Sequence, residues 1–279
     1  GSAEDLAYVK DLLGSFTTSF STSSADRSKN VNSGAKHVNG TVLYPGETFS
    51  MYETVAPFTA ENGYAMAGSY LNGEVVDSMG GGICQVSTTL YNAVLRAELE
   101  VVERSPHSMT VHYVELSEDA AIAGTYKDFK FKNSTDYPIY IEGYTTSDKK
   151  ITFNIYGKET RDSNRSISFE SVLVNEVKPN TILRDDAGQG LGYKNVSAGK
   201  TGYVAELYKI VKVNGVQTDR IKINKSTYKG SDRVVTYGTA GDPTLSENLR
   251  AAIAAQDEAL ADANVAAANA AAAAAAPAQ

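Results

Sequence analysis

MGGGICQVSTTLYNAVL, residues 79–95, is the stretch of the chain that decides its fold. Apolar residues recur through it and just beyond it at helical spacing, at Val86, Leu90, Ala93, Val94 and Ala97. This spacing predicts an amphipathic helix over residues 85–97 with one apolar stripe. Three glycines at 80–82 precede the helix, and glycine permits left-handed backbone and close approach of other groups. The single cysteine, Cys84, therefore stands where a glycine turn passes into a helix.

The position of Cys84 favours chemical reactivity. The first N–H groups of a helix have no partner inside the helix and carry partial positive charge, which lowers the pKa of a thiol placed there. Such backbone N–H groups, here near Gly82 and Gln85, can hold the oxyanion that forms when a thiolate attacks a carbonyl. The pattern is typical of an acyl-transfer nucleophile. The alternative is a small buried cysteine that caps a core helix, but a structural cysteine does not require the glycine run.

A cysteine nucleophile needs a base, and the chain has three histidines. Alternation over residues 109–116 predicts a strand, whose successive side chains face opposite sides. Only one of His107 and His112 can then meet Cys84. His107 is preferred because it lies at the mouth of the strand beside a loop, and we expect it within or near hydrogen-bond reach of the thiol. His112 and His37 are interpreted as surface or hydrogen-bonded histidines.

The group that orients the imidazole is left open by the sequence. Asp119, Asp128 and Glu103 are candidates, and a backbone carbonyl would also serve, while each carboxylate taken alone is better explained as an ordinary surface charge. One cysteine excludes an intrachain disulfide, and with three histidines it disfavours a Cys/His metal site. We therefore expect no metal and no organic cofactor.

The rest of the N-terminal region reads mainly as strands. Alternating apolar residues predict strands around Phe129, Ile139 and Ile151, and Asn72-Gly73 predicts a tight hairpin. Helices are expected over residues 4–13 and 30–39, while Gly1-Ser2-Ala3 resembles a tag-cleavage scar. The expected fold of residues 4–160 is α+β, with the nucleophile-bearing helix against an antiparallel sheet.

The C-terminal region divides into two further parts after a joint at residues 161–164. Strand signals predict an elongated all-β module over residues 165–239, with a hairpin at Asn214-Gly215 and no histidine or cysteine. Residues 240–279 are an alanine-rich tail, expected to be helical or disordered. Its alanine content predicts one helix over 246–276, either a spacer or a docking helix. Charged residues interrupt that run, which argues against a membrane helix.

Length and net charge limit the number of domains and the class of protein that the chain can be. The 279 residues suggest about two domains. The net charge is −7, from 26 Lys+Arg and 33 Asp+Glu, and this argues against a nucleic-acid-binding protein. The abundance of tyrosine, 17 residues, suits a β-rich chain outside the cytoplasm.

Two parts of the chain resemble known families. Five pieces within residues 16–156 resemble the VanW-like domain: FTTSFSTSSADRSKNVNSGAKHVNG, TVLYPGETFSMY, GGGICQVSTTLYNAVLRAELEVVER, PHSMTVHYV and DFKFKNSTDYPIYIEG. Residues 165–239 resemble the extracellular module named for its five glycines, through VSAGKTGYVAELYKIVKVNGVQTDRIKINKSTYKGSDRVVTYG. The segment DDAGQGLGY within that module is less regular.

The resemblance implies a location, a substrate and two residues. It implies a Gram-positive cell-envelope protein, extracellular in the wall and membrane-anchored at full length. VanW-like domains with this cysteine are regarded as L,D-transpeptidases that crosslink peptidoglycan, and the second module as a binder of wall sugars. Carried over to this sequence, the family's cysteine is Cys84 and its histidine is His107.

The resulting hypothesis is a transpeptidase that joins two diaminopimelate residues through a Cys84 thioester. Two alternatives stay open. The thioester could be given to water, which makes a cysteine peptidase or carboxypeptidase of the stem peptide. The chain could also be a non-catalytic wall-binding protein with a buried Cys84.

Overall fold

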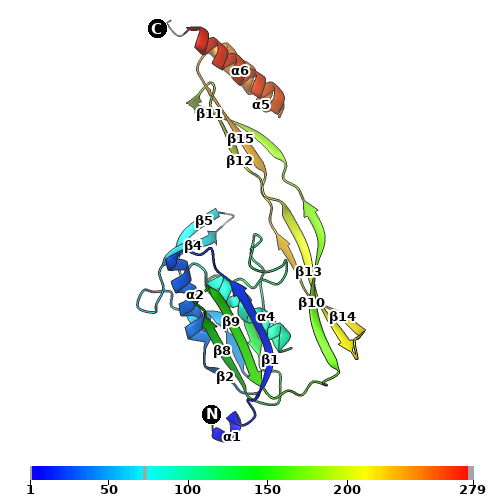
Figure 1. The fold of residues 1–279 in the computed structure, drawn as a ribbon. Helices are drawn as coiled ribbons and strands as arrows, with labels where there is room; N and C mark the ends of the chain where they lie inside the picture. The colour runs from blue at the N-terminus through cyan, green and yellow to red at the C-terminus, as the bar shows by residue number, and fades with distance from the viewer. Residues whose placement is uncertain (1, 72–73, 276–279) are drawn as a thin grey trace. The chain divides into compact units, whose positions relative to one another are not determined.

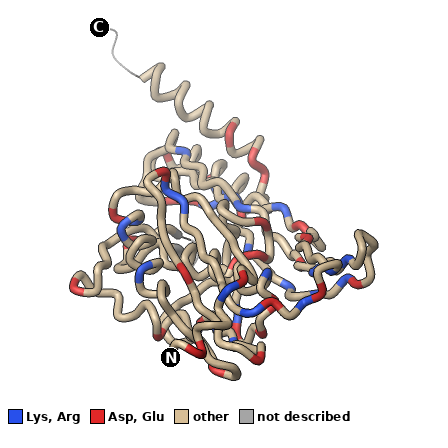
Figure 2. Tube along the Cα trace, turned by 60° about the horizontal axis from the view of Figure 1, so that its bottom comes forward, with Lys and Arg blue, Asp and Glu red and all other residues tan. Residues whose placement is uncertain are grey.

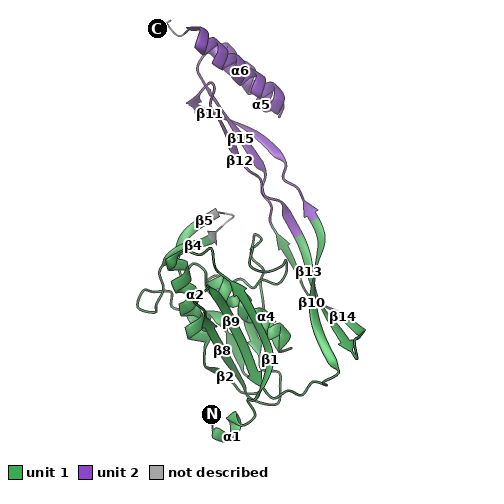
Figure 3. Ribbon diagram, in the orientation of Figure 1, with its two compact units in different colours: residues 1–175, 204–228 green, residues 176–203, 229–279 purple. Residues whose placement is uncertain are grey.

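The structure is a computed structural model that describes residues 2–71 and 74–275 (Figure 1). The chain forms two compact units (Figure 3), unit 1 with residues 1–175 and 204–228 and unit 2 with residues 176–203 and 229–279. These units divide the chain differently from the boundaries expected from the sequence. The strands of the expected all-β module are shared between the units, and the alanine-rich segment belongs to unit 2.

The elements of unit 1 are mostly short. Its helices are α1 (Ala3–Leu6), α2 (Ala25–Val38), α3 (Met51–Val55) and α4 (Ile83–Arg96). The strands before residue 160 are β1 (Asp11–Ser19), β2 (Thr41–Leu43), β3 (Thr48–Ser50), β4 (Met66–Leu71), β5 (Glu74–Met79), β6 (Glu100–Glu103), β7 (Lys130–Lys132), β8 (Ile139–Thr145) and β9 (Lys150–Gly157). Three longer strands, which lie wholly or mostly in this unit, form a second sheet in the order β10 (Arg165–Val177), β13 (Gly202–Val213) and β14 (Val216–Tyr228).

The central sheet of unit 1 is antiparallel, in the order β1-β9-β8-β2. Alternation in the sequence becomes burial on one face, since alternate side chains of a strand point the same way. The fully buried residues include Ile139, Ile141, Ile151, Phe153 and Ile155. Helix α4 packs on β1 and β9, and α2 packs on β8 (Figure 1). Each large apolar side chain buried here contributes roughly 1.5–3 kcal/mol, and this packing fixes the start of α4 where the candidate nucleophile lies.

The helix expected over residues 4–13 is wrong beyond Leu6, where α1 ends. Strand β1 begins at Asp11 and pairs with β9. Leu13 is buried while Leu12 is exposed, so the apolar spacing of this segment serves a strand. Long-range pairing with β9 overrides the local helical spacing.

The strand expected over residues 109–116 is also wrong, because residues 104–122 form neither helix nor strand. The backbone N–H groups of this loop donate to a side chain and to another loop residue instead of pairing with a neighbouring strand. The Ser117 N–H donates to the phenol oxygen of Tyr228 at 2.7 Å, and the Ala121 N–H donates to the Ser105 carbonyl at 2.8 Å. Ser117 also takes a left-handed φ of 67°, which a regular strand does not allow.

The expected hairpin at Asn72-Gly73 lies outside the described residues. The strands on either side of it, β4 and β5, are antiparallel and run in register from Met66 opposite Met79. Lys and Arg are interspersed with Asp and Glu along the chain trace (Figure 2). In the described ranges, no helix combines the length and apolarity that a membrane crossing needs.

Unit 2 packs helices on a small sheet. Strands β11 (Thr181–Gly190), β15 (Arg233–Ala240) and β12 (Lys194–Ser197) lie in that order, and α5 (Pro243–Ala254) packs on β11 and β15 and against α6 (Glu258–Ala275). The single helix expected over 246–276 is therefore wrong. Gln256 breaks it with a φ of 55°, and its side-chain amide binds the N–H and the carbonyl of Leu183 at 2.7 and 3.0 Å.

Candidate active site

The glycine turn before α4 is tightly enclosed. A Cβ on Gly81 would lie 2.3 Å from the carbonyl oxygen of Ala67 in β4. Gly82 is the N-cap of α4 with a left-handed φ of 106°, and a Cβ there would lie 2.9 Å from Cγ of Arg27. A larger residue at either position would displace backbone or strain it. The turn thus fixes where Cys84 enters the helix.

Cys84 is the second residue of α4 and is half-buried. Its Sγ lies 3.4 Å from the carbonyl oxygen of Ile122, and the imidazole of His107 lies close enough to act on the thiol. Burial raises the pKa of the thiol, but the hydrogen bond and the charge of His107 outweigh burial and lower it overall. A half-open thiol with a lowered pKa has the properties of a nucleophile.

His107 and Asp119 form a buried pair beside Cys84. Oδ2 of Asp119 accepts from both Nδ1 and the backbone N–H of His107, each at 2.7 Å. A carboxylate only accepts, so Nδ1 carries the proton and Nε2 is left for the thiol. Burial lowers the pKa of His107, but the hydrogen bond to Asp119, together with the hydrogen bond and charge of Cys84, raises it to about 9. The pair therefore favours thiolate and imidazolium together.

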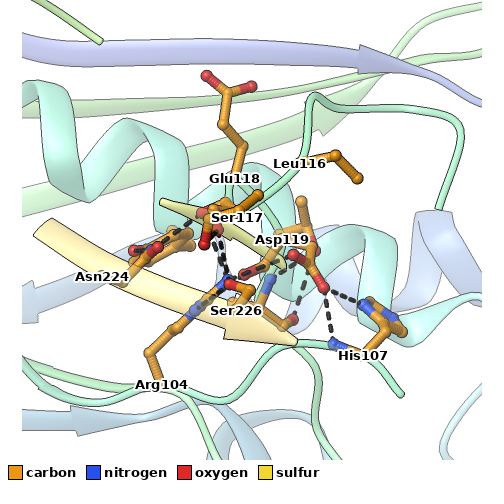
Figure 4. Close-up of polar contacts among 12 residues, drawn as sticks. Arg104, His107, Leu116, Ser117, Glu118, Asp119, Asn224 and Ser226 are labelled. Carbon is orange, nitrogen blue, oxygen red and sulfur yellow. Dashed lines mark hydrogen bonds and ion pairs between the residues drawn. The ribbon is translucent and has the colours of Figure 1, made fainter. Parts of the chain in front are cut away.

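The second oxygen of Asp119 is held by two further residues, of which Figure 4 labels Arg104. Oδ1 accepts from the phenol of Tyr228 at 2.5 Å and from Nη2 of Arg104 at 3.2 Å, and Nε of Arg104 donates to the Asp119 carbonyl at 2.8 Å. Burial raises the pKa of Asp119, but its bonds to His107 and the charge of Arg104 lower it overall. A fully buried carboxylate is thus kept ionised by partners on both oxygens.

Strand β14 supplies residues to this network that the sequence analysis missed. Besides Tyr228, Ser226 accepts from Nη1 of Arg104 at 2.9 Å, and Nδ2 of Asn224 donates to the Ser117 carbonyl at 2.9 Å (Figure 4). The expected all-β module has no histidine or cysteine, and nothing in its sequence indicates a part in catalysis. No local signal in the strand could have revealed these contacts, since they join residues more than 100 positions apart.

The two other candidate carboxylates lie elsewhere. Asp128 accepts from the Ser50 hydroxyl at 2.5 Å and from the Tyr52 N–H at 2.9 Å, at the start of α3. Glu103 accepts from the Asp128 N–H at 3.1 Å and pairs with Lys130. The structure brings Cys84, His107 and Asp119 together and gives Asp128 a role in holding α3.

The remaining histidines are separate from this group. His37 binds the Ser33 carbonyl through Nδ1 at 2.6 Å and Oδ1 of Asn62 through Nε2 at 2.9 Å. His112 is exposed and its ring packs edge-on against Tyr113. Neither is hydrogen-bonded to Cys84 or Asp119 within the described part of the chain.

The backbone N–H groups expected to hold an oxyanion differ in availability. The Gln85 N–H donates to the Gly82 carbonyl at 3.1 Å, so it is already engaged. Within residues 2–71 and 74–275, the N–H groups of Gly82 and Cys84 donate to no acceptor. The Gln85 side chain is also engaged, since Nε2 donates to the Ser19 carbonyl at 2.8 Å. The available donors are therefore Gly82 and Cys84 rather than Gln85.

Tyr113 is a further neighbour of the thiol that the sequence did not single out. Burial raises its pKa well above the usual range, and the charge of Cys84 acts in the same direction. Thr88 acts on the pKa of the phenol in the opposite direction, but burial outweighs it. The described residues contain no His/Cys/Asp/Glu cluster of metal-binding type.

Two family models match the chain in succession. Residues 26–156 match the model described as VanW like protein, and residues 170–240 match the G5 domain. The chain carries a VanW-like domain followed by a G5 domain. Cys84, His107 and Asp119 lie in the VanW-like domain, whereas Ser226 and Tyr228 lie in the G5 domain. The network around Asp119 is therefore built from both.

The VanW-like region has curated relatives. The chain is 41% identical over 140 residues to the protein named Uncharacterized protein YoaR of Bacillus subtilis (strain 168), covering 50% of this chain and 46% of the relative. It is 31% identical over 134 residues to Vancomycin B-type resistance protein VanW of Enterococcus faecalis (strain ATCC 700802 / V583), covering 46% and 48%. The chain thus spans about half the length of these relatives.

Among solved structures, the chain is similar to an IgA1 protease G5 domain. The two are 22% identical with a TM-score of 0.23, and the match covers 28% of this chain and 94% of that one.

Proposed function

We propose that this chain is a cysteine acyltransferase of the Gram-positive cell wall, an L,D-transpeptidase that links two diaminopimelate residues of peptidoglycan stem peptides. The observation that carries the proposal is the contact of His107 with buried Asp119 at 2.7 Å beside a half-buried Cys84. Nucleophile, base and orienting carboxylate in this order are what acyl transfer through a thioester requires. The VanW-like and G5 domains support the wall context.

In the proposed first step, the Cys84 thiolate attacks the carbonyl of the bond between diaminopimelate and the terminal D-alanine. The N–H groups of Gly82 and Cys84 are the donors offered to the oxyanion. The tetrahedral intermediate collapses as the C–N bond breaks, and the imidazolium of His107 gives its proton to the leaving amine of D-alanine. A thioester on Cys84 and a neutral His107 remain.

In the second step, the side-chain amine of another diaminopimelate attacks the thioester. Neutral His107 accepts a proton from this amine, the C–S bond breaks, and the new amide forms. Thiolate and imidazolium are restored, and Asp119 stabilises the imidazolium at both stages. The residues present supply every proton transfer in this cycle. We further propose an extracellular location, membrane anchoring of the full-length protein, and binding of wall glycan by the G5 domain.

Incubation with purified muropeptides followed by mass spectrometry tests the proposal. We expect dimers with a diaminopimelate-to-diaminopimelate bond from the wild type and none from Cys84→Ala. Shortened monomers without dimers would indicate the hydrolytic peptidase instead. Cys84→Ala protein that still forms the crosslink, or wild type that alters no stem peptide, would leave the chain as a non-catalytic wall-binding protein.

A further inference from the structure

Arg27 brings a positive charge to the start of α4. It lies in the first turn of α2 and is half-buried. Its Nη1 donates to Oε1 of Gln85 at 2.9 Å and to the Ser23 hydroxyl at 2.7 Å. A Cβ on Gly82 would lie 2.9 Å from Cγ of Arg27 and 3.5 Å from Nε. The side chain therefore lies against Gly82, two residues before Cys84, and Gln85, the residue after it.

The charge of Arg27 has no carboxylate to neutralise it among the described residues. Arg104 pairs with Asp119 at 3.2 Å, and Arg161 pairs with Glu159 at 2.8 Å. The partners of Arg27 are instead neutral oxygens, and both are reached through Nη1. Its Nε and Nη2 donate to no acceptor in residues 2–71 and 74–275, so one edge of the guanidinium is available for a ligand.

Gln85 holds Arg27 in this position. The Gln85 side chain is fully buried, and its Nε2 donates to the Thr18 hydroxyl at 3.0 Å and to the Ser19 carbonyl at 2.8 Å. These bonds fix the amide so that Oε1 faces Arg27. The charges of Arg27 and Cys84 both act on the phenol of Tyr113, which is consistent with one shared site.

We propose that Arg27 binds a carboxylate of the acyl-donor peptide beside Cys84, namely the free C-terminal carboxylate one residue beyond the attacked carbonyl. A guanidinium edge matches the two oxygens of a carboxylate. This assignment rests on the proposed acyl transfer and adds its substrate class: peptides that end one residue after the scissile bond. Arg27 is then a specificity-determining residue that does not take part in proton transfer.

The experiment compares alkylation of Cys84 in the full chain by iodoacetate, which carries a carboxylate, and by neutral iodoacetamide. Arg27→Gln is expected to lower the iodoacetate-to-iodoacetamide rate ratio by about tenfold, the effect of losing one charge-assisted hydrogen bond. Arg27→Lys keeps the charge without the planar edge. Its rate ratio is expected to lie between those of the wild type and Arg27→Gln. Lys29→Gln makes the same charge change at an exposed position of the same helix and should leave the ratio unchanged.

The ratio separates this inference from the proposed function. A slow iodoacetamide reaction in the wild type would count against an activated Cys84, whatever the ratio does. An unchanged ratio in Arg27→Gln, or an equal fall in Lys29→Gln, would overturn the carboxylate site even if Cys84 is reactive. Circular dichroism of each variant shows that the compared proteins are folded, and Arg27→Lys provides the comparison if Arg27→Gln does not fold.

Discussion

Asp119→Asn perturbs the candidate site at its most buried point. The substitution keeps the size of a fully buried side chain and removes its charge. His107 then loses the charged acceptor of the hydrogen bond that counteracts burial most strongly and helps raise its pKa to about 9 from the ordinary 6.5. At about 1.4 kcal/mol per pKa unit, that elevation corresponds to about 3 kcal/mol of preference for the imidazolium. Losing most of it leaves His107 neutral at pH 7.

A neutral His107 no longer stabilises the Cys84 thiolate. Burial then dominates and returns the pKa of the thiol to its ordinary 9.0 or above. A thiol with that pKa is ionised to about 1% at pH 7. We therefore expect alkylation of Cys84 by iodoacetamide at pH 7 to slow by up to about 100-fold in Asp119→Asn, and to recover as the pH is raised above 9.

The assay measures the rate of alkylation by mass spectrometry of the intact protein. The pH is varied from about 5 to about 10, because this interval includes both lowered and ordinary pKa values of a thiol. Asp128→Asn is the matched control, because it removes another buried carboxylate that binds Ser50 and Tyr52 instead of His107. An Asp119→Asn profile that overlays the wild type would refute the reasoning. So would an equal shift in folded Asp128→Asn.

Two further predictions concern stability. Tyr228→Phe removes the donor to Asp119 and leaves the buried Ser117 N–H without its acceptor, so urea denaturation should give a free energy of unfolding lower by about 1–3 kcal/mol; the exposed Tyr126→Phe is the control, and equal stabilities would contradict the network. Burial raises the pKa of Glu98, but Arg165, Lys209 and Arg161 hold it at about 2. This depressed pKa contributes stability above pH 4.5 that is lost as the pH falls towards 2, about 3 kcal/mol in all. Glu98→Gln should lack this acid-dependent part in urea titrations at pH 6 and pH 2.5, and an unchanged acid dependence would show that the ion pairs do not act this way.

Sequence patterns among neighbouring residues predicted those features of the fold that depend on neighbouring residues. The apolar spacing after Gly82 predicted α4, and the glycine run placed Cys84 at its start, because both depend on neighbouring residues alone. The short helix expected over residues 30–39 overlaps the second half of α2, which ends at Val38. The apolar residues of 4–13 predicted a helix where β1 begins. The prediction was wrong because the pairing of β1 with β9 is a long-range contact, and local spacing carries no information about it.

The choice of orienting carboxylate illustrates the limit at the site. The sequence offered three candidates for the carboxylate that orients His107, with no local pattern to choose among them: Asp119, Asp128 and Glu103. Asp119 meets His107 because residues 104–122 form a loop whose backbone is held by distant side chains. The expectation of a strand there hid this arrangement.

The sequence by itself determined that one thiol begins an amphipathic helix after three glycines, since helical periodicity and glycine's backbone freedom are properties of adjacent residues. Only the tertiary structure decided that His107 faces that thiol, that Asp119 holds His107, and that Tyr228 of a G5 strand 109 residues away completes the carboxylate's bonds. The physical reason is that a buried charge must satisfy its hydrogen bonds from whatever segments the fold brings together, and sequence spacing does not encode that meeting.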